Sequence, residues 1–563
     1  MPPSGVGGWG KHPAGTSPGR GPYVACLLLA VACVYGAALD SGFVNYDDLA
    51  QIVQNRLVTA PAEAPLERLL LTPSHGYIVP VTLLTQSVLW WLGHGHAWVF
   101  HVFGLTVHAG LSLALFLTLD RVAPRARAFA GALIFALHPV CVEPVLWATG
   151  IKDLLAATLS FVATVAFVRF ASRQSPSLSQ GALAVVAAAM AMLSKPTAAL
   201  LGLAWLAFLL SRRRAPERGA WTVAGAASVL GLLIGVSSRL THDALIAREP
   251  IEWRWPLPLS VLGRQALHLV WPVDLHPSYQ IDPGRVDAHT VLGLFVTAGL
   301  VAALFRLRHA PLPLLCVAAA IATYLPVSDV LPFARRMSDS YLYSPLAALV
   351  ACAVLALGPG TSRRTSRVLG NLGLVAAVGL GIAARHQTRR WHDSVSLWTD
   401  AVASMPEFDT ALGGLASARA LRGEYLTAVL LYERAFARAY RGDLVDDFAV
   451  TLANAGRLDD AECAMIEGAL TGPSGLKALR NYAVLLARNP GRPLRYPEVA
   501  AYLLPTAIYG AESGGISLDA RSIARLEARW RSEAPPSSWK GVPSAPQWAR
   551  GTCDVLRPHR QSP

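Results

Sequence analysis

Long runs of apolar residues recur along this chain, and they constrain its fold more than any other feature. The runs are about 16–22 residues long, which is the length that a helix needs to cross a hydrocarbon core about 30 Å thick. Ala and Leu dominate the runs, and backbone groups inside a bilayer must find their hydrogen bonds within each helix. Only 15% of all residues are charged, against about 25% in soluble chains. The sequence therefore predicts an all-α fold, a polytopic bundle of membrane helices.

The apolar runs predict about eleven membrane spans. We place them at residues 23–39, 98–119, 129–147, 151–170, 181–193, 197–210, 221–237, 291–305, 312–327, 341–357 and 369–384. Two further apolar stretches, 77–92 and 257–273, would reverse the orientation of every later span. Both contain proline and the second also contains charge, so we expect interfacial or re-entrant helices on the outer face there.

The distribution of arginine predicts which side of the membrane each loop occupies. Loops enriched in Lys and Arg stay in the cytoplasm, and we therefore expect the N-terminal tail, residues 1–22, to be cytoplasmic and the first span to be an uncleaved signal anchor. These loops hold much of the excess behind the net charge of +13, which argues against a nucleic-acid partner. The basic loops lie at residues 121–127, 169–173, 212–218, 306–308 and 363–367.

Carboxylates gather on the opposite side, in the predicted outer loops and outer helix ends. The rule that orients membrane helices concerns Lys and Arg and places no demand on acids. Longer outer loops would hold more polar residues in any case, whereas an active cavity that opens outward would require them. The sequence leaves both explanations open.

After residue 386 the chain changes to soluble helical sequence with an internal repeat. Matching small and large apolar residues recur at a separation of about 33 residues, which is typical of tetratricopeptide hairpins, although a plain helical bundle is an alternative. The first copy has Leu415, Gly423, Tyr425, Ala428, Tyr432 and Ala435, and the second has Phe448, Gly456, Leu458, Ala461, Met465 and Gly468. A degenerate third copy spans 476–507. We assign 23–386 to the membrane domain, 387–532 to the repeat domain and 533–563 to an irregular tail.

Two adjacent carboxylates follow the first predicted span, in the stretch SGFVNYDDLAQIVQN. Consecutive residues of a helix point about 100° apart, so we expect only one of Asp47 and Asp48 to face a cavity. A partly desolvated carboxylate can act as a general base for a hydroxyl. Either residue could instead cap the helix that follows, and spacing alone favours the cap.

A second polar cluster lies in ALHPVCVEPVLWATGIKDLLA. His138 and Glu143 fall at the outer end of the third predicted span, and Lys152 and Asp153 begin the fourth. Ionisable residues at membrane depth mark function or pair with each other, so Lys152 and Asp153 are either site residues or an interfacial ion pair. The spacing of His138 and Glu143 is not that of a zinc motif, so we assign no metal ligands.

Lysine and arginine side chains lie in two further predicted outer loops. Lys195 lies in LSKPTA, where Pro196 breaks the helix, and Arg335 and Arg336 lie in VSDVLPFARRMSDSYLYSP. A guanidinium can bind a phosphate through two parallel hydrogen bonds, so these cations suit a lipid phosphate or diphosphate. Attraction to ordinary lipid headgroups explains them equally well.

Taken in order, the motifs of this chain resemble one family. They are NYDDLAQIVQN, FHVFGLTVH, ALHPVCVEPVLWATGIKDLL, LSKPTA, LVWPVDLHPSYQ, SDSYLYSP and RRWHDSVSLWTDAV, followed by the repeats. This order is similar to that of the TMTC-type (transmembrane and tetratricopeptide repeat) O-mannosyltransferases and their bacterial relatives. The resemblance implies a GT-C glycosyltransferase that moves a sugar from a polyprenyl-phosphate donor to a hydroxyl acceptor, outside the cytoplasm and with inversion.

The resemblance also implies roles for individual residues. The family has its reaction centre at an acidic motif in the first outer loop, so Asp47 or Asp48 binds and deprotonates the acceptor, which reverses the preference for a helix cap. The candidate substrate-binding residues are His138, Glu143, Lys152, Asp153, Lys195, Arg335, Arg336, Asp339 and Tyr341. The repeats are expected to bind an acceptor protein or glycan on their concave surface. The sequence leaves open whether a divalent metal assists.

One motif departs from the family. Relatives carry Asp-Arg-Tyr where this chain has Asp339, Ser340 and Tyr341, so one phosphate contact is missing and Arg335 or Arg336 is the candidate substitute. The leading hypothesis is a multi-pass enzyme of a bacterial inner membrane with an extracytoplasmic repeat domain. The altered motif favours the alternative, an inactive membrane anchor whose repeats bind an envelope protein.

Overall fold

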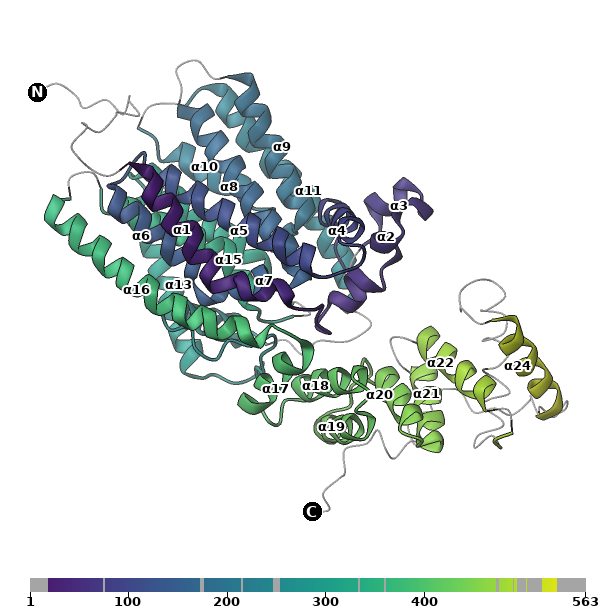
Figure 1. Ribbon diagram of the computed structural model, residues 1–563. Coiled ribbons are helices and arrows are strands. Elements are labelled where there is room, and N and C mark those ends of the chain that lie inside the picture. Colours follow the sequence, from purple (N-terminus) through teal and green to yellow (C-terminus); the bar gives the residue numbers. More distant parts are fainter. Residues whose placement is uncertain are drawn as a thin grey trace, which may run out of the picture. The chain divides into compact units, whose positions relative to one another are not determined.

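The computed structural model describes residues 19–73, 76–172, 177–213, 216–246, 254–332, 335–358, 361–471, 475–489, 491–493, 503 and 519–533 (Figure 1). Within these ranges every regular element is a helix. The chain divides into two compact units, one that ends at Leu397 and one that begins at Trp398. The predicted all-α fold class is therefore confirmed.

Every apolar run that was predicted as a span is helical. Among the described residues, 7 helices are long and apolar enough to cross a membrane. Three of them count together with an adjoining 3-10 turn: α1 (Arg20–Tyr35) within Arg20–Asp40, α8 (Ile151–Ser172) within Ala148–Ser172 and α15 (Tyr343–Ala356) within Asp339–Ala356. The other four are α5 (Trp98–Leu119), α11 (Arg218–Ile246), α13 (Ala288–Leu307) and α16 (Arg363–Arg390). The shorter apolar helices are α9 (Leu178–Ser194), α10 (Leu201–Leu210) and α14 (Pro311–Tyr324). The chain is thus a multi-pass membrane protein, and the count of eleven spans stays a prediction.

Prolines interrupt the helices at two places where polar residues cluster. The predicted span 129–147 is not one straight helix, because α6 (Arg125–Leu137) and α7 (Val142–Leu146) meet at a bend of 52°. Pro139 begins the 3-10 turn between them, since proline has no N–H to continue a helix. Pro196 separates α9 from α10 in the same way, as the sequence predicted.

A buried core joins α1, α5, α6, α15 and α16. Figure 1 shows α1, α5 and α6 side by side, and these helices are in direct contact. Tyr35, Phe116 and Tyr343 are at most 1% exposed within this core. His108 lies among them, with Nδ1 2.8 Å from the Tyr343 hydroxyl and Nε2 2.9 Å from the Ala136 carbonyl oxygen. This histidine therefore belongs to the packing of the bundle.

Two further helices, α4 and α12, are not among those that are long and apolar enough to span a membrane. They form the segments that were predicted to lie at the outer face, and this placement stays a prediction. The remaining short helices of the first unit lie in the loop after α1. The bounds of these helices are α2 (Arg56–Thr59), α3 (Leu66–Leu71), α4 (Pro80–Leu92) and α12 (Pro256–Val270).

Glycines bring α12 into close contact with α13. A Cβ atom added to Gly293 would lie 1.9 Å from the Leu259 carbonyl oxygen, and one added to Gly263 would lie 1.9 Å from the His289 carbonyl oxygen. Small residues let two helix backbones approach each other closely. The two glycines therefore hold α12 against the rest of the unit.

The second unit begins with two helix hairpins. Its helices are α17 (Ser394–Ser404), which crosses the division between the units, α18 (Asp409–Leu421), α19 (Tyr425–Arg438), α20 (Val445–Asn454), α21 (Leu458–Thr471), α22 (Gly475–Arg488) and α24 (Ala520–Glu533). Gly423 and Gly456 follow the first helix of each hairpin with a φ of +81°, which glycine adopts without strain.

The hairpins have the predicted spacing, and their assignment as tetratricopeptide repeats stays a prediction. Tyr432 and Phe448, one from each hairpin, are fully buried with ring centroids 5.3 Å apart. Of the predicted third copy, α22 is helical, whereas Ala500, Leu504 and Ala507 lie outside the described residues.

Replacing Gly293 by Ala should destabilise the first unit, because the new Cβ would collide with the Leu259 carbonyl group. Overpacking of this kind costs about 1–3 kcal/mol, so the full chain in detergent should melt at a lower temperature. Gly299→Ala is the matched control on the same helix, since a Cβ there meets no atom within 4 Å and alanine favours helix more than glycine does. Equal melting temperatures for the two variants would contradict the close packing of α12 on α13.

Candidate functional site

Four polar segments that are far apart in the sequence meet at one end of the helix bundle. They are the loop after α1, the turn between α7 and α8, the break between α9 and α10, and the loop before α15. Asp48 contacts Thr149 in the second segment, and Asp47 contacts Arg335 in the fourth. An ion pair joins α8 to the third segment. The structure therefore brings most of the predicted site residues into one cluster.

Asp48 is 1% exposed, and its carboxylate is bound inside the fold. Oδ1 accepts hydrogen bonds from the Thr149 backbone N–H at 2.9 Å and from the Thr149 hydroxyl at 2.7 Å. Oδ2 accepts a hydrogen bond from the Val44 N–H at 3.1 Å. Burial raises the pKa of Asp48 to about 6, although these hydrogen bonds oppose the rise. The side chain makes no capping hydrogen bond to the helix that follows, so the interpretation of Asp48 as a helix cap is wrong. Asp48 instead connects the loop after α1 to the turn between α7 and α8.

Asp47 is more open, with a side chain that is 19% exposed. Its Oδ2 accepts a hydrogen bond from Nη2 of Arg335 at 2.8 Å. The guanidinium carbon of Arg335 lies 4.3 Å from the ring centroid of Tyr46 and 5.2 Å from that of Trp147. Cation–π contacts strengthen as water is excluded, so the two rings hold Arg335 beside the carboxylate. Tyr46 is itself fixed by a hydrogen bond from its hydroxyl to the Pro277 carbonyl oxygen.

Two lysines lie over aromatic rings in the same cluster. Nζ of Lys152 is 4.7 Å from the ring centroid of Trp147, and Nζ of Lys195 is 5.0 Å from that of Tyr341. Lys195 also forms an ion pair with Asp153 at 2.5 Å. The ion pair of Asp153 is thus with Lys195, and the alternative interpretation of a pair with Lys152 is wrong.

Glu143 and Asp339 form a second acidic group in which every carboxylate is hydrogen-bonded. Glu143 accepts hydrogen bonds from the Ser338 hydroxyl and, at 3.1 Å, from the Asp339 N–H. The Asp339 carboxylate accepts hydrogen bonds from the Tyr279 hydroxyl at 2.8 and 2.9 Å and lies 3.1 Å from Nδ1 of His268. Burial raises the pKa of Tyr279 well above its usual value, so its hydroxyl keeps the proton that it donates.

His138 and Arg336, two of the predicted site residues, contact α12 and the loop after it. Nδ1 of His138 accepts a hydrogen bond from the Val140 N–H at 3.3 Å, and its Nε2 lies 3.2 Å from the Leu269 carbonyl oxygen. Arg336 donates to the Ile281 carbonyl oxygen at 3.0 Å. Both therefore stabilise the segments around the cluster.

Sequence reasoning missed five residues that shape the cluster. Tyr46 precedes the two aspartates directly, and Trp147 and Thr149 lie within a motif already singled out, so their position in the sequence could have identified them. Tyr279 lies in the motif LVWPVDLHPSYQ, which was quoted for the resemblance without a site residue, and His268 lies in the stretch that was expected to be an interfacial or re-entrant helix. No sequence pattern connects these two residues with Asp339.

The described residues contain no candidate metal site. Within them, no three His, Cys, Asp or Glu side chains are arranged to hold a metal ion. We therefore derive no reaction step through a metal.

Comparisons with known proteins confirm the resemblance to the TMTC-type family. Residues 75–238 match the family model described as dolichyl-phosphate-mannose-protein mannosyltransferase. The chain is 30% identical over 277 residues to the protein O-mannosyl-transferase TMTC1 of Homo sapiens, which covers 46% of this chain and 29% of that protein. It is 34% identical over 165 residues to the protein O-mannosyl-transferase TMTC4 of Homo sapiens, a match that covers 24% of this chain and 22% of that protein. It is 30% identical over 159 residues to the protein O-mannosyl-transferase TMTC1 of Mus musculus, a match that covers 26% of this chain and 17% of that protein.

These comparisons cover only parts of the proteins. The chain spans less than a third of the length of each relative that it matches, and no solved structure matches it. The family model includes Glu143, Lys152 and Lys195 but ends before Arg335 and begins after Asp47. This family model therefore does not bear on the roles of Asp47 and Arg335.

Asp48 should make the stability of the chain depend on pH between about 4 and 7. Because the pKa in the folded chain is about 6, against 3.8 for an ordinary aspartate, the folded state binds this proton more tightly than the unfolded state does. The stabilisation is complete below the unfolded pKa and is lost as pH rises through the folded pKa. The unfolding free energy of the wild type, minus that of Asp48→Asn, should therefore fall over this range in detergent.

Thr149→Val provides a second test of the same assignment. The hydrogen bonds from Thr149 lower the pKa of Asp48, so removal of the hydroxyl should move the stability transition to a higher pH. If the unfolding free energy of the wild type minus that of Asp48→Asn does not change with pH, the pH dependence of stability does not come from Asp48.

Proposed function

We propose that this TMTC-like chain, which carries a dolichyl-phosphate-mannose-protein mannosyltransferase-family domain, is a membrane glycosyltransferase. It transfers a sugar from a polyprenyl-phosphate donor to a hydroxyl acceptor on the extracytoplasmic side. The contact between Asp47 and Arg335 carries the proposal, because it sets a carboxylate and a phosphate-binding cation side by side at the end of a membrane bundle.

In this reaction Asp47 is the general base. The acceptor hydroxyl attacks the anomeric carbon of the sugar, and Asp47 takes the hydroxyl proton. The bond from that carbon to the phosphate oxygen breaks, and its electron pair leaves with the lipid phosphate, so the configuration inverts. Geometry favours Asp47 over Asp48, since both carboxylate oxygens of Asp48 already accept hydrogen bonds from the fold.

Arg335 binds the departing phosphate, with Lys152 and Lys195 as further cations. A guanidinium forms strong paired hydrogen bonds with phosphate, and donor binding would exchange the carboxylate of Asp47 for the phosphate as the partner of Arg335. That exchange frees Asp47 to act as base. Three cations around one leaving group stabilise the negative charge that develops on it.

Arg335 substitutes for the arginine that the Asp-Arg-Tyr motif of relatives would supply. The Tyr341 hydroxyl donates to the Arg335 carbonyl oxygen at 3.1 Å, which connects Arg335 with the altered motif. Arg336 is less suited, because its guanidinium is directed to the carbonyl oxygen of Ile281.

The acceptor in this proposal is a hydroxyl of a protein or glycan that the repeat domain binds. The relatives are named protein O-mannosyl-transferases, which makes a protein hydroxyl the first candidate. Stacked helical hairpins commonly bind partners on their concave surface, and the second unit begins with two such hairpins.

An inactive membrane scaffold is the second candidate, and Ser340 favours it. Ser340 stands where relatives have arginine, is 2% exposed, and has its hydroxyl oxygen 2.8 Å from that of Ser338. A serine there cannot supply a cation. A scaffold would bind an envelope protein through the repeats and would need neither Asp47 nor Arg335.

Asp47→Asn should lower glycosyl transfer by about 10²–10⁴-fold, the usual contribution of a general base, without lowering the melting temperature. The assay uses the purified full-length protein, polyprenyl-phosphate-linked mannose as the probe donor and acceptor peptides rich in Ser and Thr. Asp48→Asn is the matched neighbour and should lower the melting temperature, because it loses a hydrogen bond from Val44 or Thr149. Full transfer by Asp47→Asn would refute its role as base, and no transfer by the wild type would favour the scaffold.

The end of the bundle that carries Asp47 and the repeat domain should face the same side of a bacterial inner membrane. In a chain without its exposed native cysteines, Glu63→Cys in the first loop and Tyr440→Cys in the repeats should react with an impermeant maleimide in spheroplasts. Arg364→Cys should react only after the membrane is permeabilised, since basic loops remain cytoplasmic. Reaction of Glu63→Cys and Tyr440→Cys from opposite sides would exclude a shared site.

A further inference from the structure

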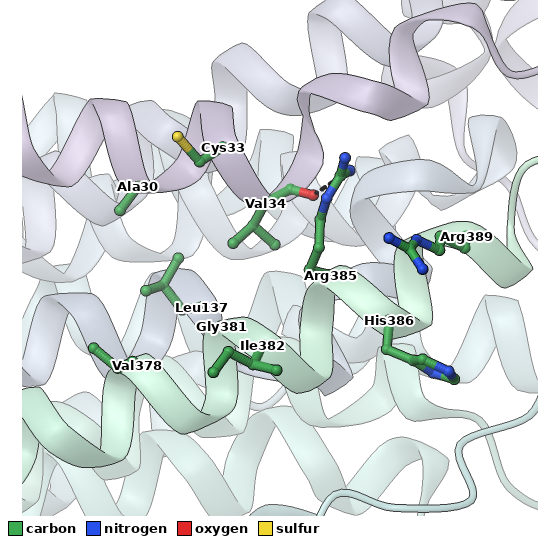
Figure 2. A pocket seen from close by; sticks show the side chains of 10 residues that line it. All are labelled: Ala30, Cys33, Val34, Leu137, Val378, Gly381, Ile382, Arg385, His386 and Arg389. Atoms are coloured by element: carbon green, nitrogen blue, oxygen red, sulfur yellow. Dashed lines mark hydrogen bonds between the residues drawn. The ribbon is translucent and has the colours of Figure 1, made fainter.

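A groove lies between α1 and α16, apart from the cluster around Asp47. Its volume is about 480 Å³. Figure 2 shows residues of α1 and α16 on its two sides and Leu137 of α6 between them. Its lining is mostly apolar near the middle of the helices and basic at the C-terminal end of α16. The lining residues are Ala30, Cys33, Val34, Leu137, Val378, Gly381, Ile382, Arg385, His386 and Arg389.

One face of α16 supplies both the apolar and the basic parts of the groove. Val378, Ile382, Arg385 and Arg389 follow each other at intervals of three or four residues, so they lie along one stripe of the helix. Val378 is 64% exposed and Ile382 is 69% exposed. In a bilayer these two side chains face lipid, and the two arginines continue the same stripe toward the membrane surface.

The opposite face of α16 packs inward, toward the candidate site. Gln387 is buried and donates to the Leu275 carbonyl oxygen at 2.9 Å. Trp391, just after the helix, is 2% exposed. None of the residues that line the groove belongs to the Asp47 cluster.

Gly381 of α16 has no side chain, which keeps the space of the groove open. A Cβ atom on Gly381 would lie 3.4 Å from Cδ1 of Leu137 and 3.8 Å from Cγ2 of Val34, which is ordinary contact. A single methyl group would fit, whereas a longer side chain would extend into the groove.

The basic end of the groove has no acidic partner in the part of the chain that the structure describes. Arg385 donates to the Val34 carbonyl oxygen at 3.4 Å, and Arg389 is exposed. Figure 2 shows the two guanidinium groups beyond the apolar part of the groove, while His386 points in another direction. Arginines lie at both ends of α16, whereas orientation of a helix requires basic residues at its cytoplasmic end alone, so the orientation rule explains only one of the two groups.

We propose that this groove binds an anionic phospholipid of the surrounding bilayer. One acyl chain lies along Val378, Gly381 and Ile382, and the phosphate accepts hydrogen bonds from Arg385 and Arg389. Basic pockets beside apolar helix surfaces recognise lipid headgroups in this way, and paired guanidinium groups suit a phosphate. The proposal is independent of the glycosyltransferase reaction, because no residue that lines the groove belongs to the Asp47 cluster.

Titration of the full-length protein with defined lipids tests the proposal. Phosphatidylglycerol and phosphatidylcholine with identical chains are added in detergent, and bound lipid is counted by native mass spectrometry. The wild type should bind phosphatidylglycerol more tightly. The double variant Arg385→Gln, Arg389→Gln should bind it roughly thirtyfold more weakly, as expected for the loss of two basic residues at a lipid surface. Gly381→Leu should weaken the binding of both lipids, because it fills the groove without changing its charge.

Two matched variants control for general effects on the helix. Gly379→Leu changes a neighbouring glycine that has no atom within 4 Å of an added Cβ, and Arg364→Gln with Arg367→Gln removes charge at the opposite end of α16. Both should bind lipid as the wild type does. If Gly381→Leu does not fold, the lipid binding of the double variant Arg385→Gln, Arg389→Gln tests the proposal by itself. Equal binding of the two lipids by the wild type, unchanged binding in the arginine variant, or purification with polyprenyl phosphate in the groove would overturn the proposal.

Discussion

The hydrogen bonds of Asp48 fix the geometry on which the candidate site depends. A buried carboxylate is costly unless hydrogen bonds compensate for its lost hydration, and here Val44 and Thr149 supply the donors. Because Val44 belongs to the first loop and Thr149 to the turn between α7 and α8, these bonds attach one segment to the other. Asp47, the residue just before Asp48, is thereby held where it meets Arg335.

The cations of the cluster are held by aromatic rings as well as by carboxylates. Tyr46 and Trp147, whose ring centroids are 5.0 Å apart, both contact Arg335, and the ring of Tyr341 contacts Lys195. An aromatic face offers a cation electrostatic attraction without neutralising its charge. The cluster therefore keeps positive charge available for an anionic substrate while excluding much of the water that would screen it.

Apolar periodicity and proline position predicted much of this fold from sequence, because both act locally. Run lengths located the helices, and Pro196 predicted the break after α9. The bend at Pro139 was missed, since the apolar run continues through it. For the site, the residue types and their loops were predicted, but the choice between Asp47 and Asp48 was not. That choice depends on Thr149, about a hundred residues away, and the pairing of Asp153 with Lys195 likewise arises only from tertiary packing.

The length of α16 has a consequence for the membrane in which the chain works. Its 28 residues extend about 42 Å at 1.5 Å per residue, close to the thickness of about 40–45 Å for a bilayer with its headgroups. Arginines stand at both ends, at 363, 364 and 367 and again at 385, 389 and 390, so each headgroup layer holds one end of the helix. A thinner bilayer would force the helix to tilt, and a thicker one would draw charge toward hydrocarbon. This helix is therefore long enough to place arginines in both headgroup layers, and its tilt would follow the thickness of the membrane.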